Sequence, residues 1–341
     1  MPVTLAEAQV NVQDDVDYAV IDQYRRRSWL LDQLTFDDCV NPGTGGATLT
    51  YGYTRLVNAR QAAFRAINSE YTPGKATRTR LTSDLKPLGG SFEVDRVIAN
   101  LGAAATNEVS FQMGETIKGS ISGFVNEVIN GDVAVDADGF DGLDKALTGS
   151  TTEYLPINNG VAVGYLDWTS GTVNTQDEAH GALDVLDEFL ALVVGGADAI
   201  IGNRSSITRV RSLARRAGYY TREEDALGRM VERYGSAVLI DAGTKVADGS
   251  TTETDVVPIE TRDADGGGAG GNITNLTDLY AVKFGLDAFH GVSTTGPLVS
   301  TWLPDFTTAG AVKTGEVEMG PVTTVLKRTT AAAVLRNIKV R

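Results

Sequence analysis

The most regular hydrophobic pattern in the chain lies between residues 103 and 131. Apolar side chains recur there at steps of three and four, at Val109, Met113, Ile117, Ile121, Phe124, Val125 and Val128. This spacing places them on one face of an α-helix, and Asn130-Gly131 supplies residues suited to its C-terminal end. A helix of about 25 residues, at about 1.5 Å per residue, is predicted to be on the order of 37 Å long.

The segment before this helix has a strand-like pattern. Strands are predicted at residues 48–57, 77–82 and 92–97, and Thr72-Pro73-Gly74-Lys75 is suited to the turn of a hairpin. Between residues 55 and 96 there are eight basic and four acidic residues. An isolated hairpin is marginally stable in water. This long, basic, apolar-poor hairpin is therefore expected to need a partner surface, which the acidic remainder of another copy would provide.

Helices and strands alternate in the second half of the chain. One helix is predicted at residues 177–194, and another is expected to be capped by Ser205 or Ser206 and ended by Gly218. Further strands are predicted at residues 197–201, 237–240 and 279–284, and a closing hairpin at residues 322–340. Residues 1–40 carry only a thin apolar stripe, which is typical of an arm or peripheral helix that needs a neighbour.

Composition and charge narrow the classes of function. The formal net charge is −14, from 44 acids and 30 bases, whereas a dedicated nucleic-acid-binding protein is normally basic, because phosphate neutralisation supplies much of its affinity. The single cysteine, Cys39, excludes an intramolecular disulfide and a cysteine zinc site. No secretory signal and no membrane span are expected, because the start of the chain and its apolar stretches lack the required patterns.

Motifs that could carry catalysis or bind a cofactor are weak. Gly266, Gly268 and Gly271 match G-x-G-x-x-G, but they lie in low-complexity glycine with no helix directly after them. The two histidines, His180 and His290, are not near a recognisable nucleophile. Paired-carboxylate catalysis stays open, because such pairing is spatial and nothing in the sequence selects a pair. No catalytic residue, cofactor site or metal site is predicted.

Two clusters of charge have a structural and a functional interpretation. The acidic cluster comprises Asp132, Asp136, Asp138, Asp141 and Asp144. It does not satisfy the EF-hand pattern, which favours a solvated loop over a calcium site. The basic cluster comprises Arg204, Arg209, Arg211, Arg215 and Arg216. These arginines spread around a predicted helix, so an inter-subunit contact with an acidic surface is favoured over a nucleic-acid patch.

The order of these elements resembles the major capsid proteins of tailed bacteriophages, whose Johnson fold is shared with encapsulins. The hairpin at residues 47–97 resembles the extended E-loop, and the helix after it resembles the spine helix of the peripheral domain. Phe140-Asp141-Gly142-Leu143 resembles the short F-x-G-L segment that follows that helix. Residues 198–203, leading into 213–219, are similar to the axial-domain strand and helix.

The resemblance implies an α+β fold with five parts. These are an N-terminal arm (1–46), the E-loop hairpin (47–97), a peripheral domain with the spine helix (98–176), an axial domain (177–315) and closing strands of the peripheral domain (316–341). Inter-subunit contacts are expected from eight basic residues, namely Arg25, Arg26, Arg55, Arg60, Arg65, Lys75, Arg78 and Arg80. Lys75 and Lys86 are candidate crosslink donors by position, but no acceptor can be aligned, so no bond is predicted.

The implied function is structural and not enzymatic. The chain is expected to self-assemble into pentamers and hexamers of an icosahedral phage head around double-stranded DNA, within the virion capsid and assembled in the bacterial host cytoplasm. A separate scaffolding protein, a portal and a cement protein are the expected partners, with no cofactor and no membrane. An encapsulin-like compartment, an α+β hydrolase and a phage tail or decoration protein remain alternatives.

Overall fold

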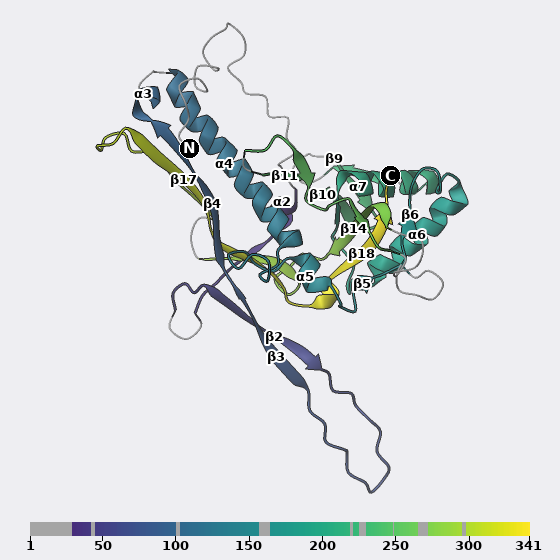
Figure 1. Cartoon of the computed structure of the whole chain (residues 1–341). Helices are drawn as coiled ribbons and strands as arrows, with labels where there is room; N and C mark the ends of the chain where they lie inside the picture. Colours follow the sequence, from purple (N-terminus) through teal and green to yellow (C-terminus); the bar gives the residue numbers. More distant parts are fainter. Residues whose placement is uncertain are drawn as a thin grey trace.

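The computed structural model of the chain describes residues 29–41, 45–99, 103–156, 164–218, 221–224, 230–247, 249–264, 272–294 and 298–341. Most of the expected N-terminal arm, including Arg25 and Arg26, and the glycine-rich segment 266–271 lie outside these residues. The described part contains two large β-sheets, a long helix beside one of them, and a hairpin that projects away from the rest (Figure 1).

The first sheet has five strands within the described residues. The path runs β1, β15, β17 and β16, and β4 also pairs with β17. The bounds are Phe36–Asp38 (β1), Lys86–Asp95 (β4), Phe289–Ser293 (β15), Val299–Trp302 (β16) and Val312–Leu326 (β17). The long helix α4, Ala103–Asn130, packs along β4 and β17, and it contacts two short helices, α2 (Leu30–Gln33) and α3 (Arg96–Ala99) (Figure 1).

The second sheet has nine strands in the described part of the chain, and its path is β5, β18, β14, β7, β10, β9 and β8. The bounds are Glu153–Tyr154 (β5), Leu166–Asp167 (β6), Ala199–Gly202 (β7), Thr221–Glu224 (β8), Met230–Tyr234 (β9), Ala237–Asp241 (β10), Glu260–Arg262 (β13), Ile273–Val282 (β14) and Ala332–Lys339 (β18). Helices α6 (Gln176–Ala191) and α7 (Arg204–Ala217) contact each other and this sheet. Shorter elements are α5 (Leu143–Leu147), β11 (Thr244–Val246), β12 (Glu253–Asp255) and the 3-10 helix η1 (Thr329–Ala331).

The core that joins the two sheets is built around the C-terminal half of α4. Its buried members include Phe124, Val125, Val128, Ile129, Leu143, Leu147, Ile201, Tyr280, Phe289 and Val322. On β7, Ile201 faces this core and Ile200 faces a second core against α6 and α7, because alternate residues of a strand point to opposite faces. The helix predicted from the stripe at residues 103–131 is confirmed, and its C-terminal half shares one core with residues of both sheets. No helix of the described residues is long and apolar enough to cross a membrane.

Local side-chain chemistry explains where the two helices of the second half begin and end. At the start of α6, Thr175 and Glu178 form a capping box, in which each side chain accepts a backbone N–H of the other. At the start of α7, Oδ1 of Asn203 accepts the Ser206 N–H at 2.8 Å, so the predicted cap at Ser205 or Ser206 is wrong. The Ser206 hydroxyl instead donates back to the Asn203 carbonyl from inside the helix. Gly218 ends α7 with a φ of 82°, as predicted.

The closing hairpin predicted at residues 322–340 is wrong. β17 pairs with β4, β15 and β16 in the first sheet, whereas β18 pairs with β5, β6 and β14 in the second. Residues Val322–Leu326 and Ala332–Leu335 are buried, so both stretches lie inside sheets and not at an edge. The division into five parts stays a prediction. Its last range, residues 316–341, contains strands that belong to different sheets.

The strand predicted at residues 92–97 ends two residues early, at Asp95. The Asp95 carboxylate accepts the Val97 N–H at 2.8 Å, and the chain turns there into α3. A short aspartate side chain that bonds the backbone two residues on commonly starts such a turn. The strand predicted at residues 279–284 is longer than expected, since β14 begins at Ile273.

Alanine substitutions at two glycines in and just after α4 are expected to change stability in opposite directions. A Cβ at Gly119 would meet no atom within 4 Å, whereas one at Gly131 would overlap the carbonyl oxygens of Phe140 and Glu127. We expect Gly119→Ala to stabilise the fold by about 0.5–1 kcal/mol, because it removes a flexible residue from a helix interior. We expect Gly131→Ala to destabilise it by about 1–3 kcal/mol through overpacking. Urea denaturation of both variants checks this, and equal effects would contradict the packing at Gly131.

Candidate assembly surface

The projecting hairpin consists of β2 (Thr50–Asn58) and β3 (Thr77–Asp84), with a long connection between them (Figure 1). The two strands pair from Thr50–Asp84 at the base to Asn58–Thr77 at the far end. Both strands and the hairpin itself were predicted from the sequence. Along β2 the residues Tyr51, Tyr53 and Arg55 are half-buried, whereas every residue of 56–76 is exposed. The base is therefore part of the folded body and the tip is not.

The turn of the hairpin lies at Ala66–Ser69 and not at residues 72–75 as predicted. The Ser69 N–H donates to the Ala66 carbonyl, and Asn68 takes a φ of 66°. Asparagine tolerates this left-handed conformation better than most residues. Gly74 does not adopt a positive φ, so the freedom that made it a turn candidate is not used.

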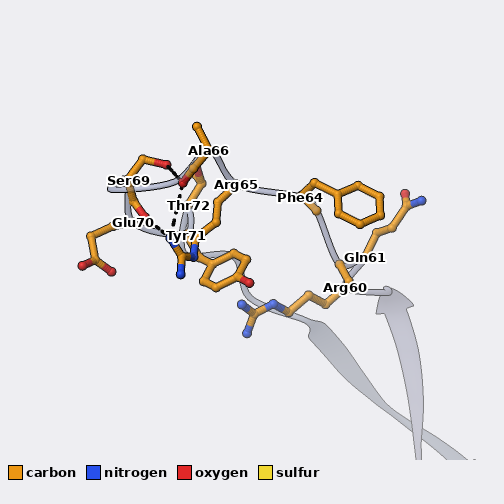
Figure 2. Close-up of a pocket in the computed structure, with 11 residues that line it drawn as sticks. Arg60, Gln61, Phe64, Arg65, Ala66, Ser69, Glu70, Tyr71 and Thr72 are labelled. Carbon is orange, nitrogen blue, oxygen red and sulfur yellow. Dashed lines mark hydrogen bonds between the residues drawn. The ribbon is translucent and has the colours of Figure 1, made fainter.

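Arg65 organises the tip of the hairpin. Its Nη1 donates to the carbonyl of Ser69 at 3.0 Å, and its guanidinium lies 5.2 Å from the centre of the Tyr71 ring (Figure 2). The loop from Arg60 to Thr72 encloses an open hollow of about 630 Å³. Phe64 points away from the Arg65–Tyr71 pair (Figure 2). Phe64 and Ile67 are both almost completely exposed. Large apolar side chains exposed on a projecting loop make the tip a candidate contact surface.

The base of the hairpin is fixed to the first sheet by polar contacts. Arg55 donates to the carbonyls of Leu326 and Lys327 at 2.7 and 3.0 Å. The hydroxyls of Ser83 and Thr323 lie 2.8 Å apart. A small buried cluster lies under these contacts, made by Cys39, Leu85, Val292 and Val325 with Tyr51 and Tyr53 against it. The direction in which the hairpin projects is thus set by this junction.

Tyr51 connects the base to β1. Its hydroxyl donates to the Asp37 carboxylate at 2.9 Å. Burial, together with this bond to a carboxylate, raises the pKa of the Tyr51 hydroxyl well above its usual range. Burial likewise raises the pKa of the Cys39 thiol, which the Asp37 charge raises further. Both groups are protonated at neutral pH, and Cys39 is a packed residue and not an activated thiol.

The predicted contact residues therefore have two different roles. Arg60, Lys75, Arg78 and Arg80 are exposed on the hairpin, where they are available to a second molecule. Arg65 is exposed too, but it holds the tip loop. Arg55 is used within the chain to hold the base. Sequence reasoning missed Phe64, Ile67 and Tyr71, and the signal for them was a set of apolar residues in an otherwise polar loop.

Four residues of the acidic cluster lie in the loop after α4, and the fifth, Asp144, lies in α5 and pairs with Arg336. Asp132 accepts from Lys145 at 2.9 Å and Asp141 accepts the Val133 N–H at 3.0 Å. The Lys145 bond is also the main cause of a lowered Asp132 pKa. In the described ranges, no group of three or more histidine, cysteine, aspartate or glutamate side chains is placed to hold a metal ion.

The basic cluster on α7 is partly used inside the chain. Arg209 donates to the carbonyl of Val340 at 2.8 Å, and Arg211 pairs with Glu232. Arg204 and Arg215 are exposed on the same helix. The proposed inter-subunit contact through these arginines stays a prediction, and only part of the set is available for it.

The chain was compared with protein-family models, with curated proteins and with solved structures. No protein-family model matches the chain, and no curated protein matches it. Among solved structures, the holo-SrpI encapsulin complex from Synechococcus elongatus PCC 7942 matches with a TM-score of 0.62 at 15% identity, over 100% of this chain and 97% of that chain. The capsid of the native GTA particle matches with a TM-score of 0.57 at 13% identity, over 98% and 97%.

A structure of Mycobacterium phage Bobi matches with a TM-score of 0.55 at 12% identity, over 99% of both chains. All three matches span nearly the full length of both chains, so they concern the whole fold rather than one shared motif. At these identities the likeness establishes the fold. The chain therefore has the HK97-like, or Johnson, fold that phage major capsid proteins, the GTA capsid and encapsulin share.

Proposed function

We propose that this chain is the major capsid protein of a tailed bacteriophage, and that it builds an icosahedral head from pentamers and hexamers of itself. The observation that carries the proposal is the hairpin, whose base is fixed by Arg55, Ser83 and Tyr51 while its tip displays Phe64 and Ile67 to solvent. An exposed tip on an anchored hairpin makes no packing contact with the other described residues of its own chain. Its position favours a second copy as the partner.

The charge of the chain supports the same proposal. The exposed bases of the hairpin face outward from a chain with a net charge of −14, so a neighbouring copy offers an acidic surface to them. An acidic body also keeps enclosed double-stranded DNA from adhering to the shell. Each contact is modest, but contacts repeated around every subunit of a closed lattice add up. A separate scaffolding protein, a portal and a cement protein complete the proposed assembly in the host cytoplasm.

A second candidate is an encapsulin-like compartment, favoured by the full-length match to the SrpI encapsulin complex. Electron microscopy of the purified protein, followed by nuclease treatment and extraction of the particles, tests both. Closed shells with nuclease-protected DNA support the capsid, and closed shells with protein cargo support the compartment. A monodisperse monomer of 36.1 kDa with hydrolase turnover, or rings or trimers typical of tail and decoration proteins, would overturn the shell.

A further inference from the structure

His290 is the second residue of β15, directly under the base of the hairpin, and it is completely buried. Its ring meets the Tyr51 ring edge-on, with the ring centres 5.9 Å apart and the planes at 74°. Neither ring nitrogen has a hydrogen-bond partner among the described residues. Buried polar atoms are nearly always paired, so this histidine is held against the hairpin in a way that no hydrogen bond explains.

Several charged and titratable groups surround His290, and they lie in or next to β1, β2, β15 and β17. Asp37 of β1 is engaged by the Tyr51 hydroxyl. The ammonium of Lys327, just after β17, lies 5.3 Å from the centre of the Tyr51 ring, and the Arg55 guanidinium is held at the neighbouring carbonyls. Asp287 precedes β15 and pairs with Arg328 at 3.2 Å, and the buried Cys39 thiol follows β1.

We propose that His290 is an acid-sensitive latch, whose neutral ring holds the hairpin base closed and whose protonation releases it. A protonated imidazole has two N–H donors and a positive charge. The backbone of Ala288 favours this form, but it can accept only one of the two N–H groups, and the charge would be buried. To reach Asp37 or water, the ring has to displace Tyr51. Tyr51 pairs with Ser83 across the two strands of the hairpin, so its displacement loosens both strands from β15 and β17 together.

The direction of the pH effect follows from the His290 pKa. Burial, and then the nearby Lys327 charge, lowers this pKa from its usual 6.5 to about 4, against smaller opposing effects of Asp37, the Ala288 backbone and Asp287. The open form exposes the ring and binds the proton more readily than the closed form. Acid therefore favours opening progressively from about pH 6.5 down to about pH 4, with no further gain below that. Above pH 6.5 the latch stays closed.

The latch is a property of the single chain and does not depend on the proposed function. Hydrogen exchange with mass spectrometry on the full-length protein, at pH 7.5 and pH 4.5, compares wild type with His290→Phe. The phenylalanine fills the same space but cannot bind a proton. We expect peptides that cover β2 and β3 to exchange equally at pH 7.5 and, at pH 4.5, at least about tenfold faster in wild type. Peptides from α6 should show no difference and are the internal control.

Two outcomes would overturn the latch: equal exchange of β2 and β3 in both proteins at pH 4.5, or acid opening that persists in His290→Phe. A second measurement covers the case in which that variant does not fold. Exchange at the histidine ring carbon in wild type reports on His290 directly. We expect the pKa of His290 to be about 4, well below the usual 6.5, and a His290 pKa near 6.5 would also overturn the proposal.

Discussion

Replacement of the hairpin tip, residues 59–76, by a two-residue Asn-Gly turn is expected to abolish shell assembly and to leave the fold of the subunit intact. The removed residues are all exposed, and β2 and β3 are already paired at Asn58 and Thr77, where the short turn joins them. The base keeps its contacts through Arg55 and Ser83. Sedimentation and electron microscopy measure assembly, and circular dichroism with urea denaturation measures the fold.

Point variants separate charge from shape at the same tip. Arg60→Glu with Lys75→Glu reverses two exposed bases and should reduce assembly, because it replaces attraction to an acidic neighbour by repulsion. Arg60→Lys keeps the charge and is the matched control, which should assemble. High salt should weaken assembly of the wild type if charge dominates. Normal shells from the tip-deleted chain would contradict the proposed role of the hairpin, and they would do so without contradicting a shell-forming function.

Much of the element order could be predicted because those elements carry local signals. The apolar stripe of α4, the alternation in β2 and the glycine at the end of α7 depend on residues close together in sequence. The misplaced cap of α7 and turn of the hairpin are errors of a few residues, whereas the largest failure concerns the pairing of whole strands. β17 and β18 look like a hairpin because they are neighbours in sequence, but they do not pair with each other. β17 pairs with the preceding strands β15 and β16 and with the distant β4, and β18 pairs with β5, β6 and β14. Strand pairing of this kind is decided by tertiary packing.

The candidate surface was predictable in part for the same reason. The basic residues of the hairpin are visible in the sequence. Whether such a residue points to solvent or anchors the foot of the hairpin, as Arg55 does, depends on the end of β17, more than 200 residues later. His290 gave no sequence signal, since its burial comes from three separate segments that meet around β15. A single histidine in a strand is as compatible with the surface as with the core.

A buried network of charges is the least predictable feature of all. Asp278 of β14 is 3% exposed and accepts from Arg262 at 2.7 Å, from Arg336 at 3.2 Å and from the Asn337 N–H at 3.0 Å. Arg336 also pairs with Asp144 and with Glu153, the latter at 2.9 Å. The nearby charges raise the Arg336 pKa in spite of burial, which acts in the opposite direction. The network joins α5, β5, β13, β14 and β18, so it ties the long helix region to the second sheet.

Removal of Asp278 is expected to cause the largest loss of stability of any single substitution considered for this chain. Asp278→Ala leaves Arg262 and Arg336 with a buried positive charge that has lost its central acceptor, which costs about 3–5 kcal/mol. Asp278→Asn keeps the volume and one acceptor oxygen, so it should lose less stability.

Asp287→Ala is the control, because it breaks an ion pair with Arg328 in which Asp287 is 81% exposed, and it should cost under about 1 kcal/mol. Urea denaturation at pH 7.5, followed by tryptophan fluorescence on proteins of the same assembly state, measures all three. Equal losses for Asp278→Ala and Asp287→Ala would show that the network is solvated and does not hold the two regions together.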